Sequence, residues 1–494
     1  MEYFVNCNTA PLTAYTVPLD KTKAAHLYRR LGFSASVQTI DAAIGQNAST
    51  LVDNLVAQAL AAPDIPAPVW ADWNRDNYPP ESEDARPIFR SQINEWRLAY
   101  TNALLDNGLK DRMSFFWSNH FVTEYEVYES NPFLYYYTNC LQRNALGNFR
   151  TFVSEIGLTD AMLFYLDGVF NNGNNPNENY GRELYELFTL GDGPSYTEQD
   201  IIETARALTG YVDRGDVRWT PVAFNPERHD SGSKTIFGRT GNWGYDDVIN
   251  ILFEERSNEI AAFICRKLYE FFVHPDSKDA TGNAEAIISG MAATFVANNF
   301  EIAPVVGQLL KSAHFFDDTA VGVIIKSPYD IYLNFVKETD FTYSNDTLDS
   351  AIDNCSLLSQ TLFNPVDVAG WQRDRSWINT NFMIGRWLTM EMFVQDYWNN
   401  DQEQFRTFGI EATGANGATT NDPDEVARAI IDKITPKGLL TEIDYGAAID
   451  VFKEPYESDM VYQNNSWNMM LQNADSQVYL LLLHLVRQPE FQLK

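Results

Sequence analysis

A helical period of 3.6 residues recurs along most of the 494-residue chain, and it constrains the fold more than any other feature. The stretch "STLVDNLVAQALAA" (49–62) places its apolar residues on one helix face, and "TEQDIIETARALTG" (197–210) does the same. The second stretch also opens with Thr197 and Asp200, a pair typical of a helix start. Alternating strand patterns are scarce and gather between 211 and 240. We therefore expect a mainly α fold, a large helical body with a short β or loop excursion near 211–246.

One stretch rich in proline and acidic residues interrupts the helical pattern early in the chain. It covers residues 63–88, where proline and charge disfavour a continuous helix. We expect it to link an N-terminal helical segment, residues 1–62, to a main helical domain, residues 89–494.

The charge balance excludes some classes of partner. The chain has 67 acidic and 36 basic residues, a formal net charge of -31. Such a chain repels phosphate backbones, so no nucleic-acid partner is expected, whereas metal ions and other cations are favoured. The acidity could also serve solubility alone. No apolar run approaches the roughly 18 residues of a membrane span, and the N-terminus lacks the basic and apolar regions of a secretory signal.

The stretch "PNENYGRELYELFTLGDG" (176–193) is the densest polar segment. On a helical period, one arc holds Glu178, Asn179, Arg182, Glu183 and Glu186. Its i,i+4 pairs of Glu and Arg would look the same on a solvated, ion-paired face and on the wall of a site. The pattern by itself favours the solvated face and leaves the site open.

Two histidine segments carry further candidate chemistry. His120 lies in "RMSFFWSNHF" and shares a helix face with aromatic residues, which is more typical of a hydrogen-bonded core histidine than of a base or ligand. His229, Asp230 and Lys234 lie close together in the glycine-punctuated loop "NPERHDSGSKTIFG". That loop could hold a metal or shuttle protons, or it could be a turn fixed by Asp230 beside a surface lysine.

Several stretches in a fixed order resemble a known bacterial family, domain of unknown function 1800. They are "HLYRRLGF" (26–33), "RMSFFWSNHF" (112–121), "NALGNFR" (144–150), "DAMLFYLD" (160–167), "PNENYGRELYELFTLGDGPSYTEQDIIETARALTGY" (176–211), "HDSGSKTIFG" (229–238), "NPVDVAGW" (364–371) and "LLLLHLVRQPEFQ" (480–492). The resemblance implies a mostly helical, usually exported protein, encoded beside a sulfatase-like partner that leaves the cell by the twin-arginine route. The chain departs from the family at Ser118, where a histidine is common, and in lacking an export signal of its own.

The resemblance also implies that His120, the polar helix and the "HDSGSKT" loop share one cleft. We expect His120, Glu183, Glu186 and His229 to be catalytic, with the two glutamates dividing acid and base work in a hydrolase-like reaction. We expect three side chains to bind an anionic substrate that carries a sulfate, phosphate or uronate, namely Arg182, Lys234 and Asn179. A divalent ion such as Ca²⁺ would be held by Glu178 and Asp230.

A rival interpretation remains open at this point. The chain could be a non-catalytic scaffold or chaperone-like partner of the sulfatase-like protein, its polar helix a rigid hydrogen-bond network. By family resemblance we expect an exported or cell-surface protein that travels with a partner carrying the signal. The alternative is a cytoplasmic protein.

Overall fold

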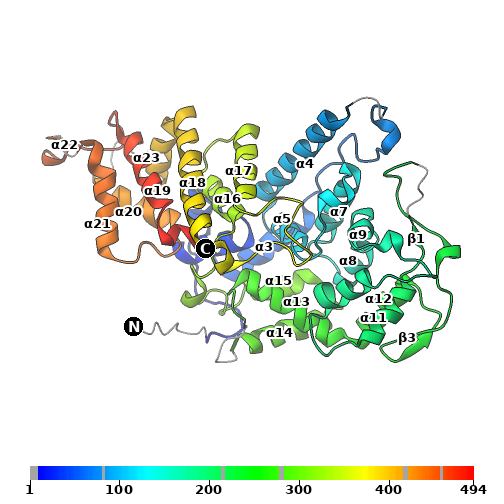
Figure 1. Cartoon of the computed structure of the whole chain (residues 1–494). Coiled ribbons are helices and arrows are strands. Elements are labelled where there is room, and N and C mark those ends of the chain that lie inside the picture. Colours follow the sequence, from blue (N-terminus) through cyan, green and yellow to red (C-terminus); the bar gives the residue numbers. More distant parts are fainter. Residues whose placement is uncertain (1–8, 81–83, 213–216, 278–282, 415–420, 457–459) are drawn as a thin grey trace.

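Helices dominate the structure, a computed structural model that describes residues 9–80, 84–212, 217–277, 283–414, 421–456 and 460–494 (Figure 1). In these ranges the strands form two small two-stranded sheets. The mainly α prediction is confirmed, and the physical reason is that each amphipathic helix buries its apolar face against its neighbours. No helix in the same ranges is both long enough and apolar enough to cross a lipid bilayer.

The first three helices are α1 (Lys21–Leu31), α2 (Val37–Ala43) and α3 (Ala48–Ala61). Each begins after a residue whose side chain accepts a hydrogen bond from the first turn, namely Asp20, Ser36 and Asn47. α1 lies inside the body, because Arg29 Nε donates to Glu338 Oε1 at 2.5 Å and both side chains are buried. The described part of residues 1–62 thus packs against the rest of the chain. The division at residues 62 and 88 stays a prediction.

The next region contains α4 (Arg86–Asp106), α5 (Leu109–Ser118), α6 (Tyr125–Tyr128), α7 (Asn131–Asn144), α8 (Phe149–Ile156) and α9 (Asp160–Tyr165). All ten residues of α5 are buried, and α5 packs against α7. A helix buried on every side must satisfy its polar side chains internally. Asp111 Oδ1 accepts from Gln142 Nε2 at 2.5 Å, and Ser118 Oγ donates to the carbonyl oxygen of Phe115 at 2.8 Å. α5 is therefore a central helix that positions side chains on several sides.

The polar segment 176–193 forms α10 (Asn179–Glu183), which continues as a π-helical turn over Leu184–Thr189. In that turn the N–H of Leu190 donates to the carbonyl oxygen of Tyr185, five residues back, at 2.8 Å. One extra residue in a helical turn rotates the side chains that follow, and such turns are often found at functional sites. α11 (Glu198–Ala207) follows, with the expected capping box between Thr197 and Asp200.

The excursion predicted near 211–246 contains both sheets. β1 (Tyr211–Val212) pairs antiparallel with β2 (Ala223–Phe224), and β3 (Lys234–Ile236) pairs antiparallel with β4 (Arg239–Gly241). The turn between β3 and β4 places Phe237 and Gly238 at φ +49° and +81°, as a two-residue hairpin turn requires. β3 packs against α11, so the excursion is held on the helical body.

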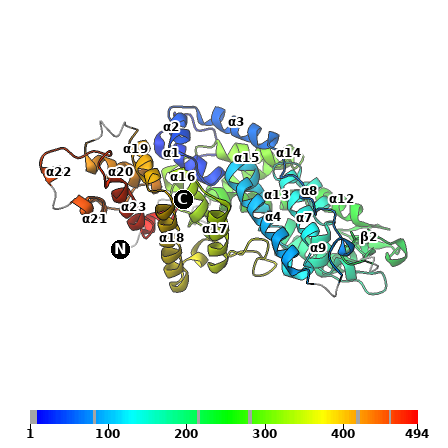
Figure 2. The same ribbon diagram turned by 90° about the horizontal axis from the view of Figure 1, so that it is seen from above.

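The remaining helices are α12 (Tyr245–Glu255), α13 (Ser257–Phe272), α14 (Asn283–Ala297), α15 (Ile302–Leu310), α16 (Pro328–Thr339), α17 (Asn345–Leu357), α18 (Thr380–Asn400), α19 (Glu403–Thr413), α20 (Pro423–Ile434), α21 (Glu442–Lys453), α22 (Met460–Gln463) and α23 (Ala474–Leu485). Helices α19 to α23 gather at one end of the molecule, and α7 to α12 with the strands form the other (Figures 1 and 2). α1 and α16 lie between them. One contiguous cluster of buried apolar side chains extends along the molecule and joins these parts.

Candidate functional site

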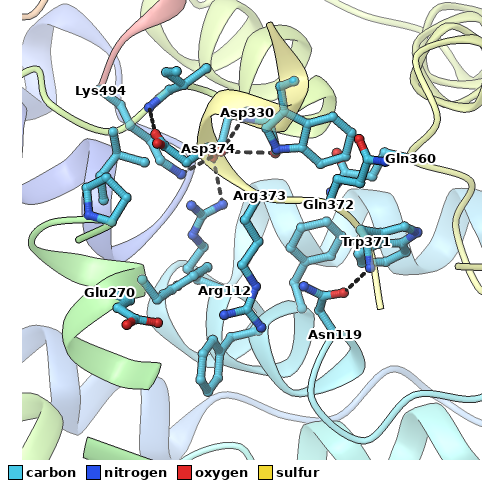
Figure 3. Close-up of a pocket in the computed structure, with 18 residues that line it drawn as sticks. Arg112, Asn119, Glu270, Asp330, Gln360, Trp371, Gln372, Arg373, Asp374 and Lys494 are labelled. Atoms are coloured by element: carbon cyan, nitrogen blue, oxygen red, sulfur yellow. Dashed lines mark hydrogen bonds and ion pairs between the residues drawn. The ribbon is translucent and has the colours of Figure 1, made fainter. Parts of the chain in front are cut away.

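A cavity lies where α5, the end of α13, the start of α16, the loop before α18 and Lys494 meet (Figure 3). It encloses about 140 Å³ that water-sized groups can occupy. The charged side chains that line it are Arg112, Glu270, Asp330, Arg373, Asp374 and Lys494. We call it the central cavity. Because segments from distant parts of the sequence form its wall, it exists only in the folded chain.

The buried end of the central cavity gathers three cations around one carboxylate. Arg112 Nη1 lies 2.8 Å from Asp330 Oδ1, and Lys494 Nζ lies 2.5 Å from Asp330 Oδ2. Arg30 lies next to them and donates from Nη2 to the carbonyl oxygen of Lys494 at 2.8 Å. Burial would raise the pKa of the Asp330 carboxyl, but Arg112 and Lys494 outweigh it and hold that pKa below its usual range. Burial, and then the charge of Arg112, lowers the pKa of Lys494 well below its usual value, so this lysine gives up its proton more readily than a surface lysine does.

Two nitrogens of the Arg112 guanidinium have no hydrogen-bond acceptor in the described part of the chain, although the group pairs with Asp330. Its pair with Asp330 is close but not aligned for a hydrogen bond at Nη1, so Nη1 and Nε have no acceptor among the described residues. Its guanidinium lies over the rings of Phe33 and Phe271, 4.4 and 4.7 Å from their centres. These rings hold the arginine in place by cation–π attraction.

Two more cations belong to this region: Arg373 lines the cavity, and Lys267 lies beside it. Within the described ranges neither forms an ion pair with a carboxylate. Lys267 Nζ lies 3.5 Å from the carbonyl oxygen of Leu187 and 4.8 Å from the centre of the Phe263 ring. Burial, and then the charge of Arg373, lowers the pKa of Lys267 to about 7, while Glu270 acts in the opposite direction. Arg373 is exposed to solvent, yet the many protein atoms around its guanidinium lower its pKa, and the charge of Glu270 acts in the opposite direction.

The wall opposite the charges is aromatic. Trp371 stacks on Phe115 with ring centres 5.3 Å apart, and its backbone N–H donates to Asn119 Oδ1 at 2.6 Å. Gly370 has φ +90°, and a Cβ atom there would lie 2.2 Å from Asn119 Oδ1. Only glycine lets the 371–377 loop approach α5 this closely. The loop thereby brings Trp371 and Arg373 to the cavity.

His120 lies outside the cavity wall, in an aromatic shell. Its Nε2 donates to the carbonyl oxygen of Phe188 at 3.0 Å, and its Nδ1 has no partner among the described residues. Burial, and then the charge of Lys267, lowers its pKa well below the usual value, so the ring is neutral near pH 7. These are the contacts of a core histidine, and the catalytic role of His120 stays a prediction.

The polar helix is an ion-pair cluster centred on Arg182. Its guanidinium contacts Glu178 at 3.2 Å, Glu186 at 3.3 Å and Glu198 at 2.5 Å, so three carboxylates already occupy the group expected to bind an anion. Glu183 is half-buried, and burial, followed by the charge of Glu186, raises its pKa. That direction suits a general acid, and the roles of Glu183 and Glu186 stay predictions.

The remaining substrate-binding and catalytic candidates contact one another or nearby backbone. Asn179 Nδ2 donates weakly to Asp167 Oδ2 at 3.4 Å. His229 Nδ1 lies 2.9 Å from the carbonyl oxygen of Thr209. Lys234 is buried, and its Nζ donates to the carbonyl oxygens of Asp230 and Gly232. Hydrogen bonds therefore hold the loop to its own backbone and to the end of α11.

The two expected metal ligands have cationic partners of their own. Arg182 pairs with Glu178, and Arg206 Nε donates to Asp230 Oδ2 at 2.7 Å. No group of three or more His, Cys, Asp and Glu side chains suited to a metal ion occurs in the described part of the chain. Calcium does not fit these two residues, and we derive no chemistry from it.

The shared cleft of the nine candidate residues stays a prediction; His120 contacts the π-helical turn that continues the polar helix. All nine lie in described ranges, and none lines the central cavity. The cavity residues Arg112, Asp330 and Arg373 were missed because each is an ordinary charged residue in its own segment. Two of the stretches that carry the family resemblance do include cavity residues: "RMSFFWSNHF" contains Arg112 and Asn119, and "NPVDVAGW" ends at Trp371.

Fold and site together define a mainly helical protein with a central cavity lined by charged side chains of both signs and by aromatic rings. The chain belongs to the family described as protein of unknown function DUF1800, whose sequence model matches residues 26–493. The match covers every residue that lines the cavity except Lys494. No curated protein and no solved structure matches the chain.

Proposed function

We propose that this chain binds an anionic ligand in the central cavity, through a sulfate, phosphate or carboxylate group. One observation carries the proposal: Arg373 lines the cavity, and Lys267 lies near enough for its pKa to be lowered by the charge of Arg373. Yet neither forms an ion pair with a described carboxylate, and the charge of Glu270 is shared between them. Two like charges in a partly desolvated place repel each other, and a bound anion would relieve that repulsion. The arrangement is unexpected in a chain with a net charge of -31 unless it has a use.

The rest of the cavity supports the same ligand. Arg112, Arg373 and Lys494 line the cavity and can attract an anion, while Glu270, Asp330 and Asp374 oppose it. The rings of Trp371 and Phe115 provide an apolar surface for the body of the ligand. The ligand class is the one predicted from the sequence, whereas the residues proposed to hold the anion are Arg373 and Lys267 instead of Arg182 and Lys234.

Other parts of the functional hypothesis rest on family resemblance alone. A hydrolase-like reaction, export to the cell surface and association with a sulfatase-like partner by the twin-arginine route stay predictions.

Calorimetric titration with sulfate, phosphate and glucuronate tests the proposal. At least one of these anions should bind, and the double variant Arg373→Met, Lys267→Met should weaken its binding about tenfold or more, because charged hydrogen bonds are lost. The matched control is Lys311→Met, which removes a surface lysine paired with Asp53. If no anion binds, or if the double variant binds as tightly as the native chain, the proposal is wrong.

A specific surface supports the scaffold alternative. Ile384, Leu388 and Met392 are 49%, 55% and 63% exposed, and their spacing of four places them along one face of α18. An exposed apolar stripe of this kind is a candidate contact surface for another protein. Co-purification of the sulfatase-like neighbour with the native chain, and its loss with Leu388→Glu, would favour this function. Co-purification unchanged by Leu388→Glu would count against the stripe.

A further inference from the structure

Three amide side chains line the central cavity, and a bound anionic group by itself gives them no role (Figure 3). They are Asn119, Gln360 and Gln372. Asn119 Oδ1 accepts from the backbone N–H of Trp371 at 2.6 Å, and Gln372 follows Trp371 in the chain. The indole Nε1 of Trp371 donates at 3.0 Å to the carbonyl oxygen of Thr361, the residue after Gln360. The three amides are therefore held on the segments that surround Trp371.

Hydrogen bonds to the backbone fix how two of these amides are turned. Gln360 Oε1 accepts from the backbone N–H of Tyr329 at 3.0 Å, as Asn119 Oδ1 does from that of Trp371. Because only the oxygen of an amide accepts such a bond, the NH2 group is the end left over. Neither NH2 group has an acceptor among the described residues. Gln360 is only 3% exposed, yet its Nε2 keeps some accessible surface, so a ligand in the cavity can reach it.

Two carboxylates in the same cavity have acceptor capacity to spare. Glu270 Oε1 accepts from Ser277 Oγ at 2.6 Å, and Asp374 Oδ1 accepts weakly from the N–H of Ile325 at 3.4 Å. The second oxygen of each carboxylate has no hydrogen-bond donor within the described ranges. Donors and acceptors thus line one enclosed space, in addition to its cations.

We infer that the ligand of the central cavity is an anion whose body carries several hydroxyl groups, the chemistry of an anionic sugar. The inference rests on the anion proposal and specifies the body of that ligand. A hydroxyl group both donates and accepts, so one ligand can accept from the amides and donate to the carboxylates. An apolar body would displace water from these groups and leave them unpaired, and a site of this kind discriminates strongly against such a ligand. The C–H groups of a sugar ring can still pack on the aromatic wall.

Two matched pairs of anions test the inference by calorimetric titration of the full chain. D-glucuronate is paired with cyclohexanecarboxylate, and D-glucose 6-phosphate with cyclohexyl phosphate. The members of each pair share the anionic group and a six-membered ring, but only the sugar has hydroxyl groups. In at least one pair the sugar should bind about tenfold tighter or more. Sodium sulfate is the anion without a body, and N-acetylglycine is the anion with a peptide group.

Variants identify the residues that produce this preference. Gln360→Met removes an amide donor, and it should lower the affinity for the sugar about fivefold or more while the cyclohexyl partner binds as before. Gln372→Leu should reduce the preference as well. Gln372 is exposed and makes no hydrogen bond to the described residues, so its result can be read even if Gln360→Met does not fold. Arg373→Met should weaken both members of a pair equally. The control is Gln38→Met, an exposed amide that bonds to Glu411 and does not line the cavity.

The outcomes separate this inference from the anion proposal. If no probe binds, the anion proposal is wrong and the inference fails with it. If anions bind but neither sugar binds tighter than its cyclohexyl partner, the anion proposal stands and the inference is wrong. Two other results would also overturn it: N-acetylglycine binds tighter than both sugars, or the preference is unchanged in both glutamine variants.

Discussion

Arg112 and Asp330 form an ion pair of 2.8 Å between α5 and α16, and their side chains are only 1% and 3% exposed. The pair joins two central helices at the buried end of the cavity, where Lys494 contacts the same carboxylate. Every charge there was removed from water on folding, so the balance between carboxylate and cations decides whether the arrangement is stable.

Replacing Asp330 by alanine should lower the free energy of unfolding by about 3–5 kcal/mol, because Arg112 and Lys494 would remain buried without a counter-charge. Urea unfolding followed by circular dichroism measures the change. Asp53→Ala, which breaks a more exposed pair with Lys311, should cost less than about 1 kcal/mol. Equal costs for the two variants would show that the buried pair has no special role.

Anion affinity should fall about tenfold as the pH rises from 6 to 8. The pKa of Lys267 is lowered to about 7, so its amine is mostly charged at pH 6 and mostly neutral at pH 8. His120 stays neutral over this range, and Glu270 and Arg373 are the other charged groups that act on Lys267. Calorimetric titration at several pH values checks the trend. Lys267→Met should bind weakly at every pH, and a native affinity that is flat between pH 6 and 8 would contradict the role of Lys267.

The imidazole of His120 should remain uncharged at neutral pH and above. Burial and the charge of Lys267 lower its pKa well below 6.5, and Nε2 is held by the carbonyl oxygen of Phe188. The ¹⁵N shifts of the ring, followed by NMR, report its protonation directly. A titration with a midpoint near neutrality would instead favour the general-base role predicted from the sequence.

Lys234→Met should destabilise the β excursion by about 1–3 kcal/mol, because the carbonyl oxygens of Asp230 and Gly232 would lose their donor. Hydrogen exchange of residues 229–242 should become faster, while Lys311→Met should leave that region unchanged. If exchange is unaffected, Lys234 is not needed to hold the loop and is free for the substrate-binding role predicted from the sequence.

The helices follow from the sequence because their signals are local. An apolar face at 3.6-residue spacing and a capping side chain act within a few residues, as Thr197 and Asp200 do at the start of α11. The β excursion near 211–246 was predictable for the same reason. The polar face of α10 was also visible, including the pairs that Arg182 makes with Glu178 and Glu186 one turn away.

Tertiary structure alone decided which charges are paired and which are free. Glu198 completes the cluster around Arg182 from the next helix, whereas Arg373 forms no ion pair with a described carboxylate and is influenced only by the charge of Glu270 across the cavity. His120 became a core residue because Phe188 offers it a carbonyl oxygen through the π-helical turn. Sequence spacing reports which side chains share a helix face, but the pairing and desolvation of a charge depend on segments that meet only when the chain packs.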